Sequence, residues 1–198
     1  MTAATATTAA HPPTSTGLDM WKLGFWVFLG SETLFFGSFI GTYMVYKGES
    51  VVGPEPTEIL NIPLTSISTF VLLMSSLAVV IALDALQRGS RKGAIFWILA
   101  IIVLGLGFLG FQANEFTHFY HEGLTLQTNL FGSTFFVLTG FHGAHVTVGV
   151  IWLFLLWVDC LRGRLGPHNA IRFEIAGLYW HFVDIVWIAI FTLIYLIN

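Results

Sequence analysis

The sequence has little cysteine and little charge. Cys160 is the single cysteine in 198 residues, which excludes an intrachain disulfide framework and a metal site built from three or four thiolates. Charged residues make up 10% of the chain, whereas a soluble domain carries about 25%. The formal net charge of −3 gives no basic patch for nucleic acid. These absences exclude a water-soluble globule, a disulfide scaffold and a nucleic-acid-binding protein.

Long apolar runs take the place of charge. The mean hydropathy is +0.80 and 56% of the residues are hydrophobic. A helix needs about 20 apolar residues to cross a hydrocarbon core about 30 Å thick. Stretches of that length predict transmembrane helices at about 21–46, 64–86, 94–118, 130–158 and 175–197. We therefore predict an all-α integral membrane bundle of five helices over residues 21–198.

The first twenty residues are rich in Thr, Ala and Pro. They have neither the basic start nor the apolar run of a signal peptide, so we expect a flexible cytoplasmic tail over 1–20. Short connectors with Gly, Pro and polar residues separate the five apolar stretches, and none is long enough to form a domain.

The cations are unevenly divided between the two ends of the predicted bundle. Five crossings place seven of them on one side: Lys22, Arg88, Arg91, Lys92, Arg162, Arg164 and Arg172. Lys47 alone falls on the other side. The positive-inside rule then predicts a cytoplasmic amino terminus and an external carboxy terminus.

Glycines are frequent inside the predicted helices. The first stretch contains four and the third contains three: Gly24, Gly30, Gly37, Gly41, Gly105, Gly107 and Gly110. Small residues let helix backbones approach closely in a membrane, so we expect these positions to pack against other helices of the same bundle. A glycine-lined pore is the alternative.

Ionisable residues are rare inside the apolar stretches. Counted from the cytoplasmic ends at 1.5 Å per residue, Glu32, Asp184 and His145 lie roughly 16, 14 and 20 Å deep. They therefore share a layer near the middle of the membrane. His142 is three residues from His145, and His181 is three from Asp184, so each pair shares a helical face. An ionisable group at this depth is costly and is a candidate functional residue.

Two histidines with nearby carboxylates suggest a metal or haem site. Against this, no three histidines lie at one depth. We expect no metal and no catalytic residue in this chain, and we expect the histidines to be neutral and hydrogen-bonded to a buried acid or a carbonyl.

Glu32 has no Lys or Arg beside it in any apolar stretch. Its carboxyl is therefore expected to be protonated or to share a proton with a histidine. Such a group can relay protons or hold two helices together, and both readings stay open.

Gln112 and Glu115 share a face at the outer end of the third stretch, followed by His118 and His121. We expect a polar cluster at the outer membrane interface, where water solvates the end of the helix.

Four motifs on four different predicted helices resemble subunit III of the haem–copper oxidases: FLGSETLFFGSF, FQANEF, GFHGAHVTVG and LYWHFVDIVWI. Their order and spacing cover nearly all of the chain beyond residue 20. The resemblance is to the shorter, five-helix form of the family, which lacks the first two helices of the seven-helix form.

The resemblance implies a non-catalytic core subunit of a respiratory terminal oxidase in the bacterial cell membrane, with cytochrome c oxidase favoured. Haem and copper are then expected in partner subunits I and II, and bound phospholipid in this chain. Glu32 matches the buried carboxyl of the family, His145 the histidine that partners it, and Gln112 and Glu115 the outer-end motif. An accessory subunit of a nitric oxide reductase and a free-standing proton or small-solute channel are the alternatives.

Overall fold

The computed structural model describes residues 19–50, 53 and 60–197, so most of the predicted tail lies outside the described residues. Within them the chain is all-α, and five helices are long and apolar enough to cross a membrane, as predicted. They are α1 (Met20–Tyr46), α3 (Ile62–Gln87), α4 (Arg91–His121), α5 (Leu130–Leu161) and α6 (Ile171–Phe191). A 3₁₀ turn (Pro167–Asn169) precedes α6, and a π turn, η2 (Thr192–Leu196), continues it.

The helices extend beyond the apolar stretches at several ends. The helix α4 begins at Arg91 and ends at His121, three residues beyond the prediction on each side, and α6 begins at Ile171, four residues early. Hydropathy marks the part of a helix that lies in hydrocarbon, whereas polar residues form the end turns in the interfacial region.

Side-chain caps and glycines set the helix ends. The carboxylate of Asp19 accepts a hydrogen bond from Trp21 N at 2.9 Å, and Asn129 Oδ1 accepts one from Gly132 N at 2.7 Å. Four helices are followed within two residues by a glycine with positive φ, at Gly48, Gly89, Gly123 and Gly163. A left-handed residue at this place ends a helix, and glycine adopts it without steric cost.

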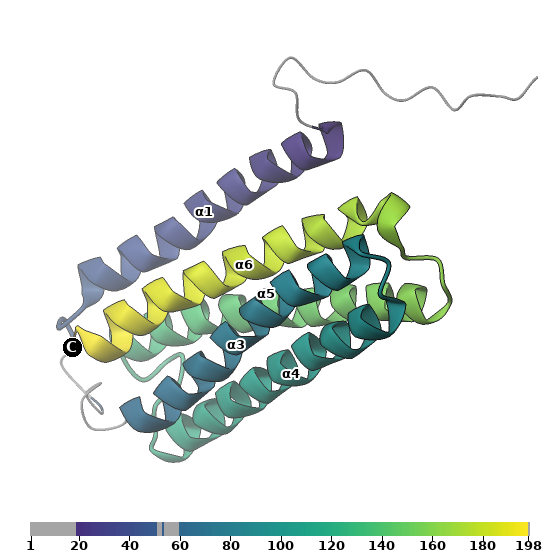
Figure 1. The fold of residues 1–198 in the computed structure, drawn as a ribbon. Coiled ribbons are helices and arrows are strands. Elements are labelled where there is room, and N and C mark those ends of the chain that lie inside the picture. Colours follow the sequence, from purple (N-terminus) through teal and green to yellow (C-terminus); the bar gives the residue numbers. More distant parts are fainter. Residues whose placement is uncertain (1–18, 51–52, 54–59, 198) are drawn as a thin grey trace, which may run out of the picture.

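The helix α6 lies between α1 and α3, with α5 behind it and α4 beside α3 (Figure 1). The helix α1 is the least enclosed. Only 11% of its most apolar segment is buried, compared with 33–50% for the other four helices. The core of the bundle is therefore formed by α3 to α6, and α1 packs along one side of it.

Glycines permit close approach in the core. A Cβ atom at Gly105 of α4 would lie 2.7 Å from Trp180, and one at Gly149 of α5 would lie 2.9 Å from the same indole. The expectation is wrong for α1, because a Cβ at each of its glycines would meet no described atom within 4 Å. It is also wrong for Gly110. Glycine content does not reveal which side of a helix faces a neighbour.

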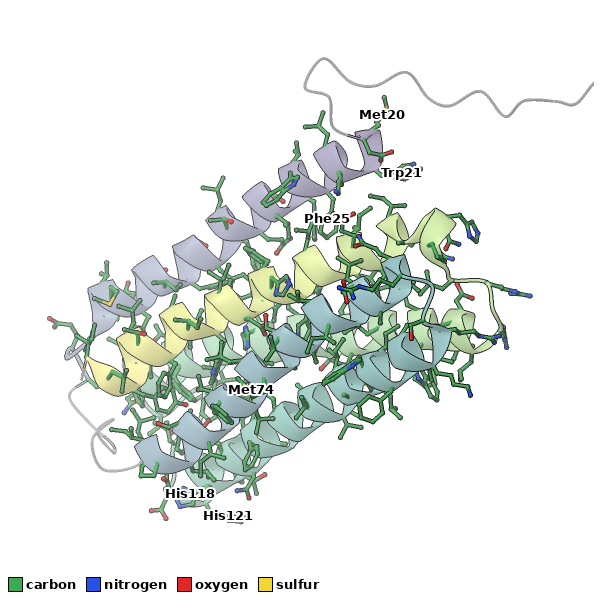
Figure 2. The ribbon with its side chains drawn as sticks, viewed as in Figure 1. Met20, Trp21, Phe25, Met74, His118 and His121 are labelled. Atoms are coloured by element: carbon green, nitrogen blue, oxygen red, sulfur yellow. The ribbon has the colours of Figure 1, made fainter. Side chains whose placement is uncertain are left out.

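The cations gather at one end of the bundle. Lys22 at the start of α1 bonds Glu174 of α6 at 2.5 Å, and Arg172 bonds Asp159 of α5 at 2.8 Å. Lys47 bonds the carbonyl of Ile197 at the other end. In Figure 2, Met20 and Trp21 lie at the opposite end of the bundle from His118 and His121. The direction of this axis across a membrane stays a prediction.

Candidate functional site

The helix α1 faces the bundle along one stripe, with residues three and four apart: Lys22, Phe25, Leu29, Glu32, Phe36, Phe39 and Tyr43. This spacing is the one that aligns side chains on a single helical face. Glu32 lies in the middle of the stripe and is therefore directed toward α5.

Glu32 and His145 form a pair across α1 and α5. His145 Nε2 lies 3.1 Å from Glu32 Oε2, and His145 Nδ1 lies 2.8 Å from the carbonyl oxygen of Phe141. A carbonyl only accepts, so Nδ1 carries a proton. Nε2 then either accepts a hydrogen bond from a protonated Glu32 carboxyl or donates one to a Glu32 carboxylate. In both arrangements one proton is shared between the two side chains.

His142 belongs to the same motif as His145 but lies in the core of the bundle. His142 is fully buried and stacks on the indole of Trp187 with ring centroids 5.0 Å apart. Neither ring nitrogen has a hydrogen-bond partner among the described residues. The expectation of a hydrogen-bonded histidine is therefore wrong here. Three residues correspond to a rotation of roughly 60° on a helix, so His142 points into the core while His145 points toward α1.

Asp184 and His181 lie at the interface of α6 with α3, not beside Glu32. Ser76 Oγ of α3 lies 2.6 Å from His181 Nδ1, and its hydroxyl is also beside the carboxyl of Asp184. Asp184 is 3% exposed, and its oxygens make no well-formed hydrogen bond within the described part of the chain. The sequence predicted Asp184 and Glu32 in one layer because their depths are similar. In the structure they lie at different interfaces, Asp184 between α6 and α3 and Glu32 between α1 and α5.

Sequence reasoning missed the hydroxyl groups of α3. Trp180 Nε1 donates to Ser75 Oγ at 2.8 Å, and Trp187 Nε1 donates to Thr69 Oγ1 at 2.9 Å. With Ser76, these residues tie α3 to α6 by side-chain hydrogen bonds. The available signal was the recurrence of Ser and Thr along an otherwise apolar stretch, which is typical of helix contacts in membranes.

Gln112 and Glu115 are buried, at 7% and 8% exposure, so the expected solvation is wrong for these two residues, whereas His118 and His121 at the end of α4 are exposed. Gln112 Nε2 donates to the carbonyl of Thr139 at 2.7 Å. Glu115 Oε1 accepts from Thr65 Oγ1 at 3.0 Å and from the Tyr195 hydroxyl at 2.9 Å. The π turn after α6 carries Tyr195 onto Glu115, a contact that a distance along the sequence does not predict.

Metal ligation needs several ligands close together. Across residues 19–50, 53 and 60–197, no group of three or more His, Cys, Asp or Glu side chains is arranged to hold a metal ion.

Two adjoining hollows lie where α1 meets α5 and α6, and we name them together the aromatic groove. Phe25, Phe28 and Trp152 line both. One hollow, of about 570 Å³, reaches His145, and the other, of about 670 Å³, reaches Arg172. Phe25 is labelled beside α1 near the end of α6 in Figure 2. The groove runs from the cationic end of the bundle to the Glu32–His145 pair.

Comparison with known proteins decides the family. Residues 2–198 match the family described as cytochrome c oxidase subunit III. The chain belongs to the cytochrome c oxidase subunit III family.

Relatives of this family carry two kinds of name. The chain is 43% identical over 176 residues to quinol oxidase subunit 3 of Bacillus subtilis, covering 89% of this chain and 86% of that protein. It is 42% identical over 179 residues to cytochrome c oxidase subunit 3 of Alkalihalophilus pseudofirmus, with the same coverage. The probable quinol oxidase subunit 3 of Staphylococcus saprophyticus is 41% identical, with 89% of both chains covered.

The family assignment confirms the resemblance seen in the sequence motifs. This subunit III homologue is a multi-pass membrane protein and a subunit of a terminal oxidase complex, which implies partner subunits. The assignment favours the oxidase over the nitric oxide reductase and channel alternatives.

Proposed function

We propose that this chain is the non-catalytic subunit III of a respiratory terminal oxidase that reduces O₂ to water and pumps protons. In this role it packs beside catalytic subunit I and subunit II, which hold the haem and copper, and it prolongs the activity of subunit I. The observation that carries the proposal is the Glu32–His145 pair, whose Oε2 and Nε2 atoms lie 3.1 Å apart between two membrane-spanning helices in a chain of this family.

The test compares the turnover lifetime of two oxidase preparations, both purified through a tagged subunit I. One is from cells that contain this chain and the other is from cells that lack it. The complete complex is expected to hold its turnover rate over many cycles, whereas the complex lacking this chain should start at a similar rate and inactivate sooner. Equal lifetimes with and without the chain would contradict the stabilising role. Failure of the chain to co-purify would contradict membership of the complex.

Cytochrome c is our proposed electron donor, and relatives of similar identity are named for both cytochrome c and quinol, so a measurement decides between the two donors. The purified complex should oxidise reduced cytochrome c faster than a quinol. Faster quinol oxidation would assign the chain to a quinol oxidase.

The aromatic groove is the proposed site of a bound phospholipid. Its walls are apolar along Phe28 and Trp152, which suits acyl chains, and Arg172 at its rim suits a phosphate headgroup. Phe28→Ala is expected to lower the phospholipid retained by the purified oxidase. Phe96→Ala, which removes an equally large ring from an exposed position of α4 outside the groove, is the control and should leave the lipid content unchanged.

A further inference from the structure

The outward side of α6 presents a polar atom at hydrocarbon depth. His181 is partly exposed, and its Nδ1 forms a hydrogen bond with Ser76 Oγ at 2.6 Å. Its other nitrogen, Nε2, makes no hydrogen bond to any residue that the structure describes. His181 is the eleventh residue of a helical segment of 26 residues, so it lies near the middle of the span.

Lipid tails offer no hydrogen bond to this nitrogen. A polar group left unpaired in hydrocarbon is costly, and polar side chains inside membranes almost always face protein or water. His181 Nε2 has no hydrogen-bond partner within the described part of the chain, so a group other than these residues is needed to pair with it.

The residues along the same side of α6 form a pattern suited to a second helix. Leu178, His181, Ile185 and Ile188, which we name the α6 seam, are spaced by three, four and three residues. All four are at least partly exposed, with Ile185 at 64% and Ile188 at 43%. This spacing aligns side chains for packing against another helix, and a single polar position in such a seam fixes the register of the contact.

We propose that the α6 seam is the surface on which a transmembrane helix of a neighbouring oxidase subunit packs, with a hydrogen bond between that helix and His181 Nε2. Because the chain belongs to an oxidase complex, helices of other subunits are available to pack on this surface. The unpaired nitrogen of His181 would recognise such a helix through a hydrogen bond. The partner helix carries a hydrogen-bonding side chain at the depth of His181. The inference rests on the proposed function, because it needs the chain to be assembled with other subunits.

Photocrosslinking in the assembled oxidase tests the surface. Benzoylphenylalanine placed at Ile185 should form a covalent adduct with another oxidase subunit. The matched control is Val103 of α4, which is 58% exposed on a side with no polar neighbour, and which should form no adduct with protein. Adducts of Ile185 with lipid alone, adducts with a second copy of this chain, or equal protein adducts at both positions would overturn the inference.

Substitution of the imidazole tests the hydrogen bond. In oxidase isolated through a tagged subunit I, His181→Leu should lower the fraction of complexes that retain this chain about threefold, the effect of one average interhelical hydrogen bond in a membrane. His181→Gln should restore part of the retention. Ser76→Ala leaves Nε2 in place and removes the bond to Nδ1, together with the hydroxyl beside Asp184, so it is the control for loss of contacts inside this chain.

Retention that is unchanged in His181→Leu, or equally reduced in Ser76→Ala, would overturn the hydrogen bond to a partner. The proposed function fails in a different way. If the parent chain does not co-purify with subunit I, membership of the complex is wrong. If it co-purifies while Ile185 reaches no other subunit, the proposed function stands and the α6 seam is not the interface.

Discussion

His145 of α5 holds Glu32 of α1 by a 3.1 Å contact halfway along the length of α1. Near the two ends of α1, Lys22 bonds Glu174 and Lys47 bonds the carbonyl of Ile197. Between these ends, no other side chain of α1 hydrogen-bonds another helix in the described residues. Among the described residues, the Glu32–His145 pair is therefore the polar contact that holds the middle of α1, in addition to the apolar packing of Leu29, Phe36 and Tyr43.

Glu32→Gln and Glu32→Ala separate the two readings of this pair. The Gln side chain is similar in size to Glu and can still form a hydrogen bond with His145. We therefore expect the Gln variant to assemble normally and to turn over at the parental rate. The Ala side chain removes the bond and opens a cavity, at a cost of about 1 to 3 kcal/mol of stability. Loss of the subunit in detergent from the Ala variant measures this. Slowed proton uptake in a fully assembled Gln variant would show that Glu32 relays protons.

Tyr195→Phe is expected to loosen the π turn at the end of α6. It removes one of the two hydroxyls that donate to Glu115 Oε1. The expected loss of stability is about 1 kcal/mol, within the range measured for hydrogen bonds between membrane helices. A lower melting temperature of the purified complex measures the loss. Tyr46→Phe removes a hydroxyl from an exposed ring and should leave the melting temperature unchanged.

Gly105→Ala is expected to destabilise the bundle. The added methyl would lie 2.7 Å from Trp180, and overpacking of a filled core costs about 1 to 3 kcal/mol. Gly110→Ala on the same helix meets no described atom within 4 Å and is the control. Equal melting temperatures for the two variants would show that Trp180 can move aside.

The cation distribution predicts which end of the bundle is cytoplasmic. Cysteines replacing Glu49 and Glu122 should react with a membrane-impermeant thiol reagent in intact cells, and one replacing Lys92 should not. All three positions are exposed, and the native Cys160 is buried, so background labelling should be low. Labelling at Lys92 alone would invert the orientation.

The sequence by itself determined the number of helices, their approximate limits and the family. Hydropathy suffices for the helices because a membrane requires every backbone group to be paired inside its own segment, so a long apolar run becomes a helix whatever surrounds it. The four motifs identified the family because each carries several residues in a fixed order.

Only the tertiary structure decided which polar residues meet. Glu32, His145 and Asp184 have similar depths, but the rotation and packing of each helix bring the first two together and place Asp184 against α3. The same reason explains why the glycines of α1 contact nothing described while Gly105 touches Trp180. The position of a residue along a helix determines its depth and its angle around the helix axis relative to other residues of that helix. Which neighbouring helix the side chain then faces is decided by how the helices pack.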